Sequence, residues 1–236
     1  MMARIAFIAS LIVLACALTM AQLDRASRSE PHLASTIPDA FAANASGLRV
    51  EQAVLAGETE AALAAARQQI RLRPIPAESL SMLAVAANLS GDSDMALAAL
   101  EEAARRGWRD PLAQLAAGEG ALQSGDVEAA AGRVAALLAT GDLQPQALDL
   151  FGRLVRTPDG RRAMAERYAA AGHWQVNSIP LAAAAVTPDL FADVMQQALE
   201  LDADLPCGQL RALAEQYRRD GEEAAAARFW PGDCPA

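Results

Sequence analysis

The sequence predicts an all-α fold, an α-solenoid of stacked antiparallel helix pairs that follows an N-terminal hydrophobic helix. Three observations predict it. Alanine and leucine, which are strong helix formers, dominate a chain that is 53% hydrophobic and only 4% aromatic. A glycine recurs at a spacing of 34 residues, and a long uncharged run opens the chain. Because β-branched residues are sparse and scattered, an all-β fold is not expected.

Length and charge narrow the classes of function. The 236 residues suffice for one domain or one extended repeat array with an apolar core. The net charge is −9, every basic residue is arginine, and no basic stripe is found. Nucleic-acid binding is therefore not expected.

The first element is a hydrophobic segment, predicted over residues 1–23 as a membrane anchor or signal segment. Residues 5–21 carry no charge, and a helix over 3–23 has a length of about 30 Å, enough to cross a bilayer. An uncleaved anchor is favoured because the run is long for a signal peptide. A cleaved signal peptide ending at Thr19-Met20-Ala21 is the second interpretation. A lipoprotein is the third, because Val13-Leu14-Ala15-Cys16 resembles a lipidation motif.

The flanking charges predict an orientation. Arg4 and the terminal amine favour a cytoplasmic N-terminus, whereas Arg25 and Arg28 weaken that bias. We expect a bacterial-type inner membrane protein with its repeat domain in the periplasm, or a soluble periplasmic protein if the leader is cleaved. Residues 24–42, which contain Pro31 and Pro38, are predicted to form a linker.

The repeat follows over residues 43–234. Gly57, Gly91 and Gly125 are evenly spaced, an acidic residue follows each of them, and an alanine lies five residues after each. This pattern is typical of the turn and second helix of a helical hairpin.

Residues 77–110 show the pattern most clearly. Leu80, Leu83, Ala84 and Ala87 form one apolar stripe on a first helix, and Gly91 ends that helix. Ala96, Leu100 and Ala103 repeat the stripe on a second helix. These large and small residues resemble the consensus of the tetratricopeptide repeat, and the chain is similar to proteins of that family over roughly residues 43–234.

Other units resemble the same consensus to different degrees. The unit from Cys207 has its turn at Gly221, and units from Pro111 and Pro145 also fit. The unit from Pro145 is shortened around 157–160. Residues 173–206 are degenerate, with helices expected over 176–185 and 188–201.

The resemblance implies a superhelix whose first helices line a concave groove that binds a protein or peptide. It implies no cofactor, no small-molecule substrate and no catalysis. The expected function is a membrane-tethered scaffold or adaptor in a cell-envelope assembly, and the alternative is a non-catalytic subunit of a membrane enzyme complex. The groove residues that the resemblance implies are Glu78, Ser81, Val85, Asn88, Leu89, Leu112, Leu115, Glu119, Leu122, Gln123, Asp149, Arg153, Arg211, Glu215 and Arg218.

The two cysteines outside the leader lie at opposite ends of the last unit. Cys207 begins its first helix and Cys234 follows its second. An antiparallel hairpin brings these two ends together, so a disulfide is expected if the domain is exported.

Two short motifs resemble chemical sites. Gly91-Asp92-Ser93 is similar to a nucleophile segment of some esterases, but it occupies a repeat turn, and the only histidines are His32 and His173. Asp202-Ala203-Asp204 is similar to a metal-binding motif of sugar-nucleotide transferases, but no strand–helix alternation accompanies it. We therefore predict no catalytic and no metal-binding residue.

Overall fold

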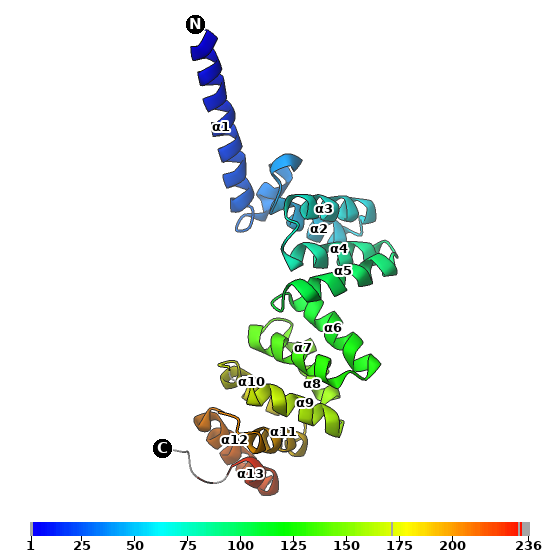
Figure 1. The fold of residues 1–236 in the computed structure, drawn as a ribbon, viewed down its shortest axis with the longest axis vertical. Coiled ribbons are helices and arrows are strands. Elements are labelled where there is room, and N and C mark those ends of the chain that lie inside the picture. Colours follow the sequence, from blue (N-terminus) through cyan, green and yellow to red (C-terminus); the bar gives the residue numbers. More distant parts are fainter. Residues whose placement is uncertain (1, 171, 231, 233–236) are drawn as a thin grey trace. The chain divides into compact units, whose positions relative to one another are not determined.

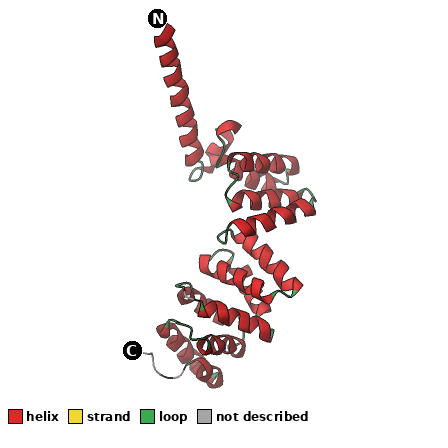
Figure 2. Ribbon diagram, viewed as in Figure 1, coloured by secondary structure: helices red, strands yellow, loops and turns green. Residues whose placement is uncertain are grey.

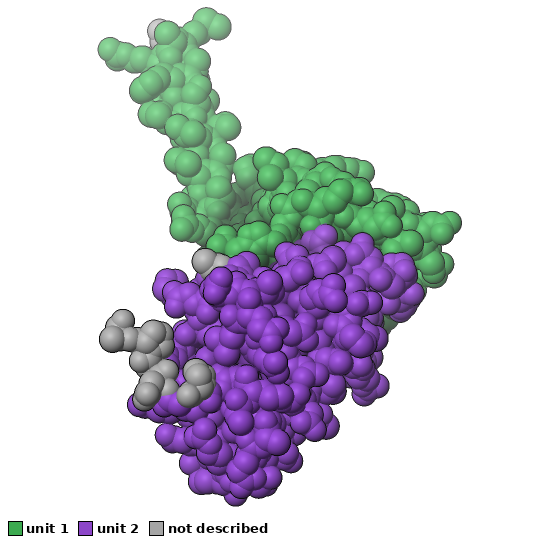
Figure 3. All heavy atoms as spheres, turned by 60° about the horizontal axis from the view of Figure 1, so that its bottom comes forward, with its two compact units in different colours: residues 1–110 green, residues 111–236 purple. Residues whose placement is uncertain are grey.

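A computed structural model describes residues 2–170, 172–230 and 232. In these residues every regular element is a helix (Figures 1 and 2), which confirms the predicted all-α fold. The chain divides into two compact units, residues 1–110 and residues 111–236 (Figure 3). The boundary between them lies inside the predicted repeat domain, at the start of a helix.

Unit 1 holds the hydrophobic helix and two helix pairs. The pairs are α2 with α3 and α4 with α5, and α3 also packs on α4, which gives the stacking of a solenoid. The elements of unit 1 are α1 (Met2–Ala26), the 3-10 helices η1 (Pro31–Thr36) and η2 (Asp39–Phe41), α2 (Ala45–Ala56), α3 (Thr59–Leu72), α4 (Ala77–Leu89) and α5 (Ser93–Arg106).

Helix α1 is the predicted hydrophobic segment. It has 25 residues, which corresponds to about 37 Å, and its apolar side chains from Met2 to Leu18 are exposed. Among the described residues it is the one helix with the length and composition to cross a membrane. A membrane anchor and a signal sequence both fit this helix.

Hydrogen bonds to Asp24 hold the end of α1 against α2 in unit 1. This carboxylate is buried and accepts hydrogen bonds from the backbone N–H groups of Asn44, at 2.9 and 3.0 Å, and of Ala45, at 2.9 Å. These donors lie at the N-terminus of α2, where N–H groups lack helical partners and a negative charge is favourable. Asp24 therefore caps α2 from the preceding helix.

The predicted linker is folded against the same helix. Ala34, Ile37 and Ala42 are buried beside α2. Arg49 on α2 donates to the carbonyl oxygens of Ala34 and Ile37. Arg49 thus supplies hydrogen-bond donors to backbone oxygens of the predicted linker.

The repeat turns form at the predicted glycines. Each has a positive φ, a conformation that favours glycine. Asp92 and Asp126, which follow two of these glycines, accept hydrogen bonds from the N–H groups of Met95 and Ala129, both at 3.0 Å. The acidic residue after the glycine is thus a helix cap. The φ angles are 72° at Gly57, 80° at Gly91, 80° at Gly125 and 84° at Gly221.

Unit 2 consists of eight further helices within its described residues. The two helices expected in the degenerate segment form within a residue of their predicted bounds. The elements are α6 (Pro111–Ser124), α7 (Val127–Thr140), α8 (Gln144–Leu154), α9 (Pro158–Ala169), α10 (Gln175–Ala185), α11 (Pro188–Glu200), α12 (Cys207–Arg219) and α13 (Glu223–Phe229).

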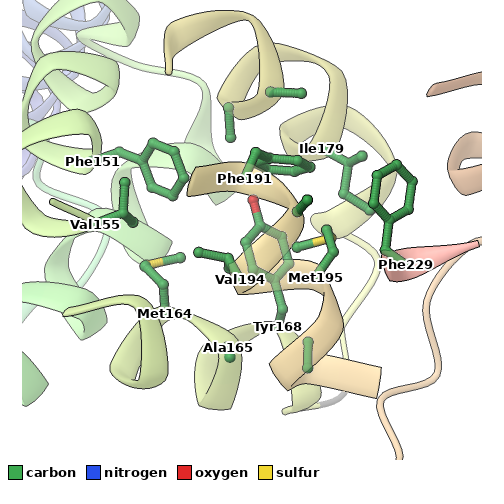
Figure 4. Close-up of a cluster of buried hydrophobic side chains, with 14 of the residues drawn as sticks. Phe151, Val155, Met164, Ala165, Tyr168, Ile179, Phe191, Val194, Met195 and Phe229 are labelled. Atoms are coloured by element: carbon green, nitrogen blue, oxygen red, sulfur yellow. The ribbon is translucent and has the colours of Figure 1, made fainter. Parts of the chain in front are cut away.

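The cores of the two units differ in composition. In unit 1 the buried side chains on α3 to α5 are mainly alanines, which allow close helix packing. In unit 2 the core also contains large side chains from α8, α9, α11 and α13. Figure 4 shows Phe151, Tyr168, Phe191, Met195 and Phe229 within this cluster. The degenerate segment therefore supplies central core residues of unit 2.

Candidate functional site

Helices α6 and α8 carry the residues that the structure brings together most clearly. Arg153 Nη2 on α8 pairs with Glu119 Oε1 on α6, and Arg153 Nε pairs with Asp149 Oδ2 at 2.9 Å. Glu119 and Arg153 are 34 residues apart, one repeat period. Residues at equivalent positions of these two successive repeats therefore lie side by side on one face, as a shared groove requires.

The three charges form a polar strip, which we define as Glu119, Asp149 and Arg153. The hydrogen bond that Arg153 donates to Glu119 is the main reason that the pKa of Arg153 lies above its ordinary value, whereas desolvation lowers that pKa. The side chains of Arg153 and Glu119 are each about one-third exposed, at 34% and 33%. The strip is thus fixed in geometry and still reachable from solvent.

The leucines beside this strip have a structural role. Leu115 and Leu122 on α6 are partly buried and pack against the core of unit 2. Both are among the groove residues that the family resemblance predicts. Because their burial stabilises the unit, a charged residue at either position would disturb folding as well as binding.

In unit 1 the predicted groove residues lie on α4 with unequal exposure. Glu78, Asn88 and Leu89 are exposed, and Val85 is half-buried. Ser81 is buried, and its Oγ donates to Asp110 Oδ1 at 2.7 Å. The exposed and half-buried side chains are therefore accessible to a partner. Ser81 instead links α4 to Asp110, the last residue of unit 1, by a hydrogen bond.

The remaining predicted groove residues are spread over unit 2. Leu112 is half-buried and Gln123 is exposed at the two ends of α6. Arg211, Glu215 and Arg218 are exposed on α12, which packs against α13 and α10. They form a charged face separate from the polar strip on α6 and α8.

The two motifs that resemble an esterase segment and a metal-binding segment have local structural roles. Asp92 caps α5, and Ser93 begins that helix. Asp202 has a φ of 59° in the turn after α11. In the residues that the structure describes, no group of three or more histidine, cysteine or acidic side chains is placed to hold a metal.

The predicted disulfide involves Cys207 and Cys234. Cys207 begins α12, as expected, and Cys234 lies outside the described residues. The pairing stays a prediction. Tyr217 on the same helix is a core residue, and burial raises the pKa of its phenol to about 12.

A cavity in unit 1 was not expected from the sequence. It has a volume of about 360 Å³ and lies between Arg28, which follows the end of α1, and helices α2, α3 and α4. No sequence signal indicates it, because its charged residues are far apart in the chain. The lining residues are Arg28, Asn44, Gly47, Leu48, Glu51, Gln69, Arg73, Glu78 and Met82.

Two comparisons with known proteins found no match. No protein-family model matches the sequence, and no curated protein matches it.

Proposed function

We propose that this protein is a membrane-tethered scaffold of the tetratricopeptide type that binds another protein outside the cytoplasm. The polar strip of α6 and α8 carries the proposal. Two of its charges, Glu119 and Arg153, come from equivalent repeat positions, and all three are held by ion pairs and reachable from solvent. Such preorganised charges favour specific recognition of a partner of complementary charge.

Two further features support the proposal. The positive-φ glycines and capping acids match the repeat pattern on which the family resemblance rests. The exposed apolar surface of α1 needs a membrane or another apolar cover, and α1 is long enough to span a bilayer.

The binding role predicts the behaviour of a charge-swapped variant. We expect the variant Glu119→Arg/Asp149→Arg/Arg153→Glu to keep the ion pairs, with the positive and negative charges exchanged. Its stability should therefore lie within about 1 kcal/mol of the wild type, while its affinity for the natural partner falls about tenfold or more. The partner is first isolated by cross-linking and detergent co-purification, and affinity is then measured by surface plasmon resonance.

The matched control is Glu128→Arg/Arg167→Glu. It swaps another exposed ion pair of unit 2, joining α7 and α9, and should leave the affinity unchanged. Unchanged binding by the folded triple variant would refute the role of the polar strip. Enzymatic activity that co-purifies with the chain would instead favour the alternative, a non-catalytic subunit of a membrane enzyme complex.

The topology is tested separately. Alkaline phosphatase fused after the repeat domain should be active in a bacterial host, because that enzyme folds only where disulfides form. The fusion protein should also stay with the membrane fraction after alkaline carbonate extraction. An inactive fusion, paired with an active cytoplasmic reporter at the same position, would reverse the orientation.

A further inference from the structure

The cavity in unit 1 holds two arginines that converge on one amide. Arg28 Nε donates to Asn44 Oδ1 at 2.8 Å, and Arg73 Nη1 donates to the same oxygen at 3.3 Å. Asn44 Nδ2 in turn donates to the buried Asp24 at 2.8 Å. The end of α1 thus orients Asn44, and Asn44 orients the two guanidinium groups.

These two positive charges are only weakly neutralised. Arg73 has Glu78 at 3.9 Å, and Glu78 is largely exposed, which makes the pair weak. Arg28 has no carboxylate within ion-pair distance among the described residues. A pair of adjacent guanidinium groups with free N–H donors is a suitable site for phosphate or carboxylate.

The same cavity also offers acceptors for a positive group. Glu51 and Glu78 both line it, and so does Gln69. Gln69 is 1% exposed, and its Oε1 accepts no hydrogen bond from the residues that the structure describes. A buried amide oxygen without a donor is costly, and a ligand that carries N–H groups can satisfy it. The cavity therefore suits a molecule that joins an anion to an ammonium group.

The position of the cavity indicates where such a molecule comes from. A hydrocarbon core of about 30 Å takes up about 20 residues of helix. Helix α1 has 25 residues and ends at Ala26. Its last turn, and Arg28 two residues later, then lie in the headgroup layer.

We propose that this cavity binds the zwitterionic phosphoethanolamine headgroup of a membrane lipid. The phosphate lies between Arg28 and Arg73, and the ammonium group faces Glu51, Glu78 and Gln69. The proposal rests on the membrane-anchor role of α1 in the proposed function. It gives the tether a second contact with the membrane, one that fixes the orientation of unit 1 against the lipid surface.

The test uses the full-length protein in nanodiscs. Nanodiscs of phosphatidylcholine are compared with nanodiscs that contain equal parts of phosphatidylcholine and either phosphatidylethanolamine or phosphatidylglycerol. Native mass spectrometry measures which lipid stays bound. We expect phosphatidylethanolamine to be retained about tenfold above phosphatidylcholine, whose quaternary ammonium has no N–H donor. Soluble O-phosphoethanolamine should compete, and inorganic phosphate should compete more weakly.

Variants separate the two halves of the site. Arg28→Gln/Arg73→Gln should lose retention of every phospholipid about tenfold. Glu51→Gln should keep phospholipid binding and lose the preference for phosphatidylethanolamine over phosphatidylcholine. The control is Arg67→Gln/Arg71→Gln, which removes two exposed arginines of α3 outside this cavity and should change neither result. Circular dichroism verifies that each variant is folded.

The outcomes distinguish this proposal from the proposed function. Equal retention of all lipids by a protein whose α1 is embedded would overturn headgroup binding and leave the tether intact. Binding of a peptide with a free C-terminal carboxylate, abolished by Arg28→Gln/Arg73→Gln without any lipid preference, would assign the cavity to a peptide and also overturn it. Loss of the leader from the mature protein in cells would refute the tether itself.

Discussion

Replacing Gly160 with alanine is expected to destabilise unit 2 by about 3 kcal/mol or more, at the upper end of the usual cost of overpacking. Gly160 is buried in the first turn of α9. A Cβ at this position would lie 2.0 Å from the carbonyl oxygen of Leu154 and 2.8 Å from its carbonyl carbon. These are backbone atoms, so no side-chain rotation can relieve the clash.

Urea denaturation followed by circular dichroism measures this effect as a lower midpoint. The matched control is Gly132→Ala, inside α7, where an added Cβ meets no atom within 4 Å. That variant should be neutral or more stable by up to about 1 kcal/mol, because alanine is the better helix former. Equal midpoints for Gly160→Ala and the wild type would contradict the tight turn between α8 and α9.

Replacing Phe191 with alanine is the second change with a large expected effect, a loss of about 3–5 kcal/mol. Phe191 on α11 is fully buried, and its ring contacts that of Phe151 edge to face, with centroids 6.4 Å apart. Truncation removes this contact and leaves a cavity among helices that surround it on several sides (Figure 4).

Thermal and urea unfolding of Phe191→Ala measure the loss. Leu201→Ala is the control, because Leu201 follows the same helix and is 48% exposed, so its truncation should cost less than about 1 kcal/mol. Similar losses for the two variants would show that α11 does not lie in the core.

Both experiments concern segments where the repeat pattern is weak. Gly160 lies in the shortened unit, and Phe191 lies in the degenerate segment. Among the described residues, the three largest fully buried side chains, Tyr168, Phe151 and Phe191, lie in these segments. A weak match to the repeat consensus therefore does not mark a poorly packed region in this protein.

The candidate binding residues show a related contrast. The sequence pattern chose positions on the first helix of each pair, and on α6 and α8 such positions meet across one repeat period. It did not distinguish a side chain open to a partner from one that supports the fold. Ser81 is buried, and Leu115 and Leu122 rest against the core.

The sequence by itself determined the helical class, the repeat turns and the bounds of the two helices in the degenerate segment. These features depend on local physics. A glycine takes a positive φ at low cost, as at Gly91, and an acid such as Asp92 caps the helix that follows. Apolar spacing sets the face that each helix buries. Residues that are close together in the sequence therefore specify these features.

Only the tertiary structure decided which distant groups meet. Asp24 caps α2 across 20 residues, and Arg49 satisfies the carbonyl groups of the segment before it. Arg28 and Arg73 converge on Asn44 from positions 16 and 29 residues away from it. Such contacts depend on how the N-terminal segment packs against the first helix pairs, and polar groups buried there must find partners wherever the fold places them. The repeat period gives no information about that packing.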